Sequence, residues 1–311
     1  MSTTIRPASS SVATAGGKHP EPRRRRMVLE RDKRRSTLLT IFVWISLIYF
    51  IVPLLWLFIS TTKDNSDLFS TFGLWFGNSF QFFANFANLF TFQGGVFWQW
   101  GLNTIIYSVT SAVGAAALAT AAGYSLAKYR FRGRTAVFSV ILGSIMVPLT
   151  ALAIPTYLLF AAANLTDSMW AIILPSLVSP FGVYLMRVYA LESVDDSLLE
   201  AARIDGAGEF RIFGTIGIRL LSPGIVTVVL FQLVATWNNY FLPLIMLNKP
   251  SLYPLTVGLN QWNSLSQTAG GTPIFNLVLT GSLLMIIPIM ITFLVMQRYW
   301  QSGLAAGSVK Q

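Results

Sequence analysis

The side chains best suited to bind a solute form a short polar and aromatic cluster. Its members are Gln232, Thr236, Trp237, Asn238, Asn239 and Tyr240. Amides donate and accept hydrogen bonds and aromatic faces provide a stacking surface, so the cluster suits a neutral, hydroxyl-rich solute. The same side chains could instead make interhelical hydrogen bonds and an aromatic belt at the membrane interface. The sequence leaves both interpretations open.

Catalytic chemistry has little support in the sequence. The chain has no Cys, and its single His, His19, lies in the N-terminal stretch, so thiol nucleophiles, Cys/His metal sites and His general bases are excluded from the core. A group of acids after residue 194 therefore lacks such partners: Asp195, Asp196, Glu200, Asp205 and Glu209. There is also no G-x-x-x-x-G-K-[ST] phosphate loop. We expect a protein that is not an enzyme, holds no metal or cofactor, and takes any nucleotide energy from another subunit.

The composition predicts that these residues are positioned by membrane helices. The chain is 54% hydrophobic and only 11% charged, far below the roughly 25% charge of ordinary soluble domains. Six apolar segments are long enough to span a bilayer. They are 38–59, 102–127, 136–162, 169–189, 221–247 and 275–299. None has a charge in its middle, which disfavours proton-coupled transport, and several contain proline, which predicts kinks or breaks.

Basic residues predict the orientation. Ten of the 22 Lys and Arg precede Ser36, and further groups lie in the 128–134 and 187–220 loops, whereas the loops on the opposite side hold only Lys63 and Lys249. By the positive-inside rule both termini are cytoplasmic. We expect three parts: a disordered basic tail over 1–37, which is attracted to anionic lipid, a six-helix permease domain over 38–299, and a cytoplasmic tail over 300–311.

The first loop on the outer side, from Thr61 to Gly101, is crowded with Phe and Trp. Amphipathic aromatic side chains settle at the level of the lipid headgroups, so the loop could be an interfacial helix or lid. It could equally be a surface on which a partner protein docks. The sequence does not separate these two interpretations.

A charged, helix-forming island interrupts the apolar segments between Ser197 and Pro223. Ser197 and Glu200 have the spacing of a capping box, Asp195 and Asp196 suit a helix start, and Glu200 can pair with Arg203. Gly206 and Gly208 should end this first helix, and a second should follow from Glu209 towards Ile218. The island thus predicts a compact helix–turn–helix knob at the membrane surface.

The knob resembles the EAA loop of binding-protein-dependent ABC importer permeases. The resemblance rests on Glu200-Ala201-Ala202, then Gly206, then Ile216, placed before the penultimate membrane helix. The family pattern has Leu-Pro where this chain has Ile218-Arg219, with Pro223 four residues later, so the start of the fifth helix is open. If that helix began at Pro223, the knob would be longer by about one turn.

Further motifs are similar to the carbohydrate, maltose-type class of these permeases. They are Asn103-Thr104, the Lys128–Gly133 stretch, Trp237–Tyr240 before Pro243-Leu244, and the C-terminal Gly303–Lys310 stretch. The resemblance implies an all-α, polytopic permease with six membrane helices in the cell membrane. It also implies alternating-access import of a sugar or oligosaccharide, driven by a separate ABC ATPase dimer that binds ATP and is coupled through the loop 195–218.

The resemblance also implies partners and roles for individual residues. The partners are the ATPase dimer, a second homologous permease subunit and an extracytoplasmic solute-binding protein, with no nucleic acid. The ATPase-coupling residues would be Glu200, Ala201, Ala202, Asp205 and Gly206, with a C-terminal ATPase contact through Gly303, Gly307 and Lys310. The candidate substrate pathway is Gln232, Trp237, Asn238 and Asn239. A secondary solute carrier and a membrane-embedded enzyme are the alternative classes, but the intramembrane charges or internal repeat that they need are not seen in the sequence.

Overall fold

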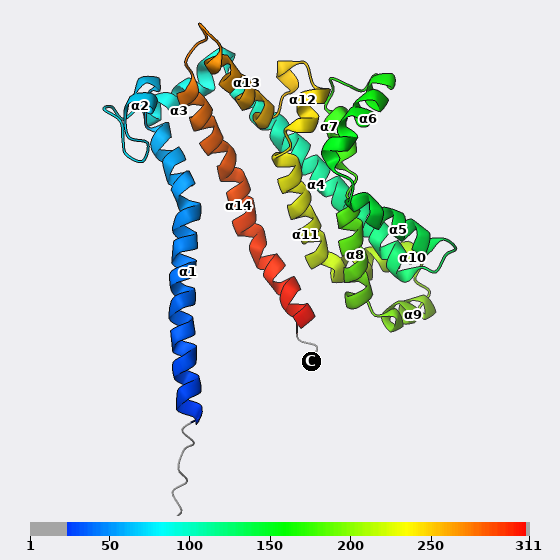
Figure 1. The fold of residues 1–311 in the computed structure, drawn as a ribbon. Helices are drawn as coiled ribbons and strands as arrows, with labels where there is room; N and C mark the ends of the chain where they lie inside the picture. Colours follow the sequence, from blue (N-terminus) through cyan, green and yellow to red (C-terminus); the bar gives the residue numbers. More distant parts are fainter. Residues whose placement is uncertain (1–23, 309–311) are drawn as a thin grey trace, which may run out of the picture. The chain divides into compact units, whose positions relative to one another are not determined.

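A computed structural model describes the backbone of residues 24–308 and the side chains of residues 37–297. That part of the chain is helical and contains no strand, so the predicted all-α class is confirmed. The long helices are α1 (Arg24–Thr61), α4 (Val96–Lys128), α5 (Arg134–Ile145), α6 (Leu149–Ala162), α8 (Pro180–Ser193), α11 (Ile218–Trp237), α13 (Leu255–Gln267) and α14 (Phe275–Ser308) (Figure 1). The shorter ones are α2 (Asn65–Ser70), α3 (Phe82–Thr91), α7 (Trp170–Ser176), α9 (Asp196–Ile204), α10 (Glu209–Ile212) and α12 (Phe241–Met246).

Five helical stretches in the described residues are long and apolar enough to cross a membrane. They are Thr37–Thr61, Val96–Lys128, Trp170–Ser193, Glu209–Trp237 and Phe275–Gln297. α5 and α6 form a further pair that is bent by 106° at a short break, where Pro148 precedes the first residue of α6. A proline disfavours helical geometry in the residue before it, so this break follows from the sequence. The six predicted spans are confirmed when the bent pair counts as one.

The predicted disordered N-terminal tail was too long. α1 begins at Arg24, so residues 24–37 are helical rather than disordered, and residues 1–23 lie outside the described part. Arg, Lys, Glu and Leu dominate this stretch and favour helix, and extending an existing helix is easier than nucleating a new one. At the other end α14 continues to Ser308 and so includes Gly303 and Gly307, while Lys310 lies outside the described residues.

The predicted boundaries of the fifth span, Leu221–Leu247, were wrong at both ends. The helix starts at Glu209, passes through a π-helical turn at Phe213–Gly217 and ends at Trp237. Pro223 lies inside it and cannot donate to the carbonyl of Arg219, but the hydroxyl of Ser222 donates to that carbonyl over 2.9 Å. The fifth helix therefore does not begin at Pro223, and the knob joins it without a break.

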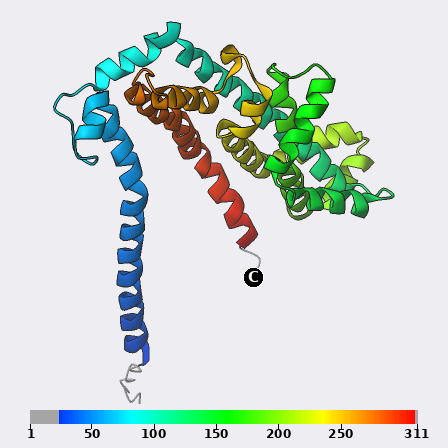
Figure 2. The ribbon, with the colours of Figure 1, turned by 45° about the horizontal axis from the view of Figure 1, so that its top comes forward.

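α4 is the central helix of residues 56–311, the larger of the two units into which the chain divides. It packs most extensively against α8 and α11, and both views show these three helices side by side (Figures 1 and 2). Its buried face is rich in small residues, which allow membrane helices to approach closely. A Cβ at Gly123 would lie 2.7 Å from the backbone nitrogen of Arg187, so only glycine fits this crossing.

Candidate functional site

The predicted knob is present as α9, a tight turn and α10. Asp205 caps the C-terminus of α9, and Gly206 follows with φ of +80°, a left-handed conformation that glycine adopts without steric cost. Gly208 is extended and caps the N-terminus of α10. The helix stop at Gly206 and the restart at Glu209 are confirmed, and the second helix runs directly into the fifth membrane span.

The predicted capping box was wrong. Asp195, not Ser197, is the N-cap of α9, and its Oδ1 accepts hydrogen bonds from the backbone N–H and the hydroxyl of Ser197, both over 2.9 Å. Asp is as good an N-cap as Ser, and Asp196 in the first turn complements the helix dipole. The helix therefore starts two residues earlier than the box implies, which confirms the role expected for Asp195 and Asp196.

A lysine at the end of α4 ties α9 to the membrane helices. Lys128 is almost fully buried, and its Nζ donates to the carbonyl of Val194 and, over 2.8 Å, to Oδ1 of Asp196. The carbonyl lies just before α9 and the carboxylate lies in its first turn. Because Lys128 bonds to both, it ties the start of α9 to the end of α4.

A second set of contacts joins the two helices of the knob. Arg203 Nε donates to Glu209 Oε1 over 2.7 Å, so the predicted pairing of Arg203 with Glu200 was wrong: the turn at Gly206 folds Glu209 back towards it. Tyr129, which follows α4, donates its hydroxyl to Glu209 Oε2 over 3.0 Å. Burial, followed by this bond, raises the pKa of Tyr129 to about 12, so the phenol remains a donor at neutral pH.

Below these polar contacts lies an apolar core. Leu199 of α9 and Ile212 of α10 are fully buried, together with Val194 and Tyr124. The ring of Tyr124 packs edge-on against Tyr129, and its ring edge approaches Gly217 so closely that a Cβ there would lie 3.3 Å away. The knob is thus packed on the ends of α4, α8 and α11 and is not a free hairpin.

The outward surface of the knob carries the candidate coupling residues. Glu200, Ala201, Asp205 and Gly206 are exposed, whereas Ala202 is half-buried against the core. Two large apolar side chains also project from it: Ile204 is 86% exposed and Phe210 is 94% exposed. Neither was singled out from the sequence, because apolar residues in a predicted amphipathic helix are expected to face inward. Their exposure is evident only once the turn at Gly206 has been placed.

Gln232, from the polar cluster in the fifth span, contacts a broken helix. Its amide Nε2 donates to the carbonyl of Ser176 over 2.8 Å. That carbonyl closes α7, and the residue four positions later is Pro180, which has no N–H to donate. Gln232 therefore replaces a backbone hydrogen bond that the proline at the start of α8 cannot make.

The rest of the cluster is divided between internal contacts and the surface. Trp237 is buried, and its Nε1 donates to the carbonyl of Met285 in α14 over 3.2 Å. Tyr240 donates to Asn260 Oδ1 of α13 over 3.0 Å. Asn239 is half-buried, and its carbonyl accepts from Thr256. Asn238 is exposed at the helix end and donates to Val234 of its own helix. The four pathway candidates therefore do not converge on one cavity.

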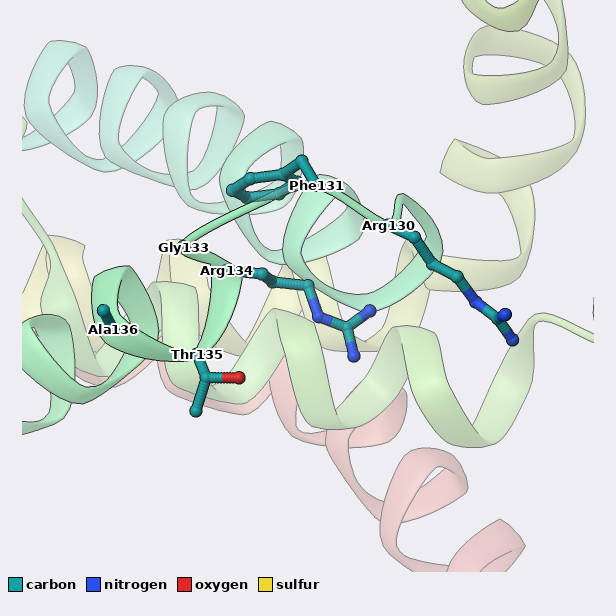
Figure 3. A pocket seen from close by; sticks show the side chains of 6 residues that line it. All are labelled: Arg130, Phe131, Gly133, Arg134, Thr135 and Ala136. Atoms are coloured by element: carbon teal, nitrogen blue, oxygen red, sulfur yellow. The ribbon is translucent and has the colours of Figure 1, made fainter.

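A concave region of about 450 Å³ lies at the turn between α4 and α5. Figure 3 shows its lining residues: Arg130, Phe131, Gly133, Arg134, Thr135 and Ala136. Gly133 has φ of +85° and caps the N-terminus of α5. None of the candidate site residues lines this region. Arg130 and Arg134 belong to the basic 128–134 loop, whose charge is the one that the positive-inside rule expects at the cytoplasmic side. In the described residues no group of acids and histidines could hold a metal ion.

Comparison with known proteins relates the chain to membrane components of transport systems. Residues 119–304 match the sequence profile of the family described as binding-protein-dependent transport system inner membrane component. The arabinooligosaccharides transport system permease protein AraQ of Bacillus subtilis (strain 168) is 34% identical over 277 residues, covering 89% of this chain and 96% of that protein. The lactose transport system permease protein LacG of Rhizobium radiobacter is 30% identical over 264 residues, covering 84% and 91%.

A solved structure shares the fold. It is the crystal structure of a bacterial ABC transporter involved in the import of the acidic polysaccharide alginate. One of its chains superposes with a TM-score of 0.74 at 24% identity, over 87% of this chain and 98% of that chain. At this identity the likeness establishes the arrangement of helices alone.

Proposed function

The chain belongs to the family of binding-protein-dependent transport system inner membrane components, and from this premise we propose that it is the permease subunit of an ATP-driven importer of a sugar or oligosaccharide. One structural observation carries the coupling part of the proposal. The loop 195–218 is a packed helix–turn–helix whose apolar core faces the membrane helices, while its ion pairs lie at the surface and Ile204 and Phe210 project outward. Such a knob is built to fit a depression on another protein.

In this proposal the energy comes from a separate ABC ATPase dimer that binds ATP, and the chain itself holds no cofactor. The first ATPase contact is the coupling set Glu200, Ala201, Ala202, Asp205 and Gly206, with Ile204 and Phe210 as its apolar anchors. Large apolar side chains at the centre of an interface contribute most of its binding energy. The second contact is the C-terminal stretch with Gly303, Gly307 and Lys310.

The transport step is alternating access. When the ATPase pair closes on nucleotide, it would displace the knob, and three connections would carry that displacement into the membrane. Lys128 joins α9 to α4, Tyr129 joins α4 to Glu209, and α10 continues into α11. Coupling of this kind requires that the ATPase contacts the knob differently in its open and closed states.

A neutral solute fits the membrane part of the chain. No Asp, Glu, Lys or Arg occurs between Leu220 and Asn248, the stretch that holds the polar cluster. Ionisable groups at that depth would be expected if the chain itself paired with a charged substrate. Asn238 is the exposed amide of the cluster and the first candidate to contact a hydroxyl-rich solute, with the half-buried Asn239 beside it, whereas Gln232 and Trp237 contribute to the pathway by holding α7 and α14 in place.

The remaining partners and the orientation follow from the family and the charge pattern. A second, homologous permease subunit would complete the pathway, and an extracytoplasmic solute-binding protein would deliver the sugar. Both termini would be cytoplasmic. In support, the basic loop 128–134 and the knob contact each other at one end of α4, while Trp100 and Asn103 at the other end contact the 250–253 stretch near Lys249.

The test is uptake by the reconstituted complex. The chain is co-expressed with its ATPase, second permease and binding protein, and ATP-dependent uptake of neutral oligosaccharides is compared with uptake of an acidic one. We expect uptake of a neutral sugar that Gly206→Asp abolishes without changing membrane insertion, because the substitution puts a charged side chain on the exposed turn of the coupling set, at a φ that favours glycine. The matched control is Gly214→Asp, since a side chain there also meets open space but φ is not positive.

Three outcomes would contradict parts of the proposal separately. Wild-type uptake and ATPase coupling in the Gly206→Asp variant would exclude the knob as the coupling element. Uptake only of an acidic sugar would exclude a neutral substrate. Uptake that continues without any ATPase subunit would favour a secondary carrier.

A further inference from the structure

The loop between α1 and α4, residues 62–95, has an unusual distribution of charge. It contains three charged residues, Lys63, Asp64 and Asp67, and no other occurs before Lys128. Lys63 is 1% exposed and Asp67 is 3% exposed, and Asp64 is half-buried as the N-cap of α2. A loop on a water-facing surface normally exposes its charged residues. This loop buries them.

The buried charges are satisfied by the loop itself. Lys63 Nζ donates to the hydroxyl of Thr71 and to the carbonyl of Phe72, both over 2.9 Å. Both carboxylate oxygens of Asp67 accept from Asn78, from its backbone N–H over 2.8 Å and its amide over 2.7 Å. Asn85 of α3 donates to the carbonyls of Thr61 and Lys63. These bonds fix a compact loop in which the side chains of Lys63 and Asp67 point inward.

The exposed surface of the same loop is aromatic. Phe83 is 77% exposed, Trp75 is 69% exposed, and Phe69, Phe72 and Phe80 are exposed to between 60% and 73%. The rings of Phe80, Phe82, Phe83 and Phe86 contact one another in a row along the start of α3. A buried polar interior beneath an aromatic exterior is the reverse of the arrangement that water favours.

The loop's place in the chain identifies what covers this surface. It directly follows the span Thr37–Thr61 and directly precedes the span Val96–Lys128, so both of its ends emerge at one face of the membrane. It lies at the end of α4 opposite Lys128 and the knob. α3 has an apolar exposed face of Phe83 and Phe86, as expected for a helix that lies in the interface. The polar side chains that this loop exposes, such as Ser70, Asn78 and Ser79, are all uncharged, so the loop offers no charge to steer or orient a soluble partner.

We propose that residues 69–86 form an interfacial anchor, with the aromatic side chains immersed in the headgroup and upper acyl region of the lipid bilayer. The anchor sets the depth of the loop and, through Asn65, the position of the start of α14: Asn65 Nδ2 donates to the carbonyl of Pro273 and to Asn276 Oδ1. Figures 1 and 2 show α2 and α3 beside this end of α14. The inference does not depend on which solute is transported.

Spin labelling tests the anchor directly, because the chain has no cysteine of its own. Full-length Phe83→Cys and Trp75→Cys variants carry a nitroxide and are reconstituted, alone and with the partner subunits, in phosphatidylethanolamine–phosphatidylglycerol vesicles. The matched control is Ser264→Cys, an exposed position on α13 near the same end of α4. We expect the ratio of collision with oxygen to collision with a water-soluble nickel chelate to be several-fold higher at 83 and 75 than at 264.

Two other results of the spin-label experiment would contradict the proposed interfacial anchor. Equal nickel access at 83 and 264 would mean that the loop is in water. Exclusion of both oxygen and nickel at 83 would mean that a protein covers the surface, which makes it a docking site. A second variant guards against loss of the loop's fold: with Phe80→Ser and Phe83→Ser combined, the label at 75 should move towards water, while the label at 264 should not change.

Discussion

The knob and the polar cluster of the fifth span are the two regions that the sequence singled out, and they use polar residues in different ways. In the knob, Arg203 pairs with Glu209, and Lys128 of α4 pairs with Asp196. These pairs fix the two short helices with Ile204 and Phe210 on the outward side. In the cluster, Gln232 and Trp237 are turned inward to backbone carbonyls of α7 and α14. One region presents a surface to a partner, and the other holds a broken helix together.

This difference arises from the solvent around each region. At the membrane surface an ion pair can stand half-exposed, so charges can build a scaffold around apolar contacts. Within the span no water can satisfy a carbonyl freed by proline, so an amide is used for that purpose first. A polar residue in a membrane helix therefore indicates a solute contact only after the nearby carbonyls have been accounted for.

The largest effect should come from removing the exposed apolar side chains of the knob. Phe210→Asp should lower ATPase binding by at least about 2 kcal/mol, or roughly thirty-fold, as expected for an aromatic anchor in an interface. Uptake should then fall to background, while membrane insertion is unchanged because Phe210 makes no core contact. Co-purification of the ATPase with the permease measures the binding.

Phe210→Leu is the control for shape and polarity. It retains an apolar side chain and should keep most of the ATPase binding and uptake. If Phe210→Asp co-purified with the ATPase as well as the wild type does, the outward face of the knob would not be the docking surface.

An intermediate effect should distinguish support from solute contact in the polar cluster. Gln232→Leu leaves the Ser176 carbonyl without its partner and should destabilise the protein by about 1 kcal/mol, the scale measured for polar contacts between membrane helices. The concentration of sugar at half-maximal uptake should not change. Thermal unfolding in detergent and uptake in vesicles give the two readouts.

Asn238→Leu is the matched control, because it removes an exposed amide that bonds only within its own helix. It should leave the unfolding temperature unchanged and raise the half-maximal sugar concentration. The reverse pattern, with Gln232→Leu changing the sugar dependence and Asn238→Leu changing stability, would exchange the roles proposed for these two amides.

The sequence predicts most of the fold but not the details that give each site its role. Apolar length, the charge rule and the glycine at 206 predict the six spans and the knob, because each depends on local composition or backbone geometry. Three predictions were wrong: Ser197 as the N-cap, Glu200 as the partner of Arg203, and Leu221 as the start of the fifth span. Each depends on a choice between neighbouring candidates, such as Asp195 or Ser197 for the N-cap and Glu209 or Glu200 for the partner of Arg203. The second choice is decided by the turn at Gly206, which folds Glu209 back towards Arg203.

The function of Gln232 shows a different limit. Pro180 was visible in the sequence as a break, and Gln232 as an intramembrane amide, but nothing local connects two residues that lie 52 positions apart. Their relation arises only because α11 and α8 pack side by side against α4. A useful signal would have been to pair each intramembrane proline with a nearby amide or hydroxyl, as Ser222 already does for Pro223 within one helix.

The smallest effect should come from the hydroxyl that joins α4 to the knob. Tyr129→Phe removes the hydrogen bond to Glu209 and should lower stability by about 0.5 kcal/mol, the low end for a partly exposed bond, with a modest loss of ATPase coupling.

The pKa of Tyr129 is raised to about 12 in the folded protein, above its ordinary value of 10.0. The phenol's contribution is therefore complete below pH 10 and is lost as the pH rises through about 12. The difference in unfolding free energy between wild type and Tyr129→Phe should accordingly stay constant between about pH 6 and 9. Equal unfolding free energies for the two proteins in that range would mean that the bond to Glu209 contributes nothing, and the displacement of the knob would then reach α4 through Lys128 alone.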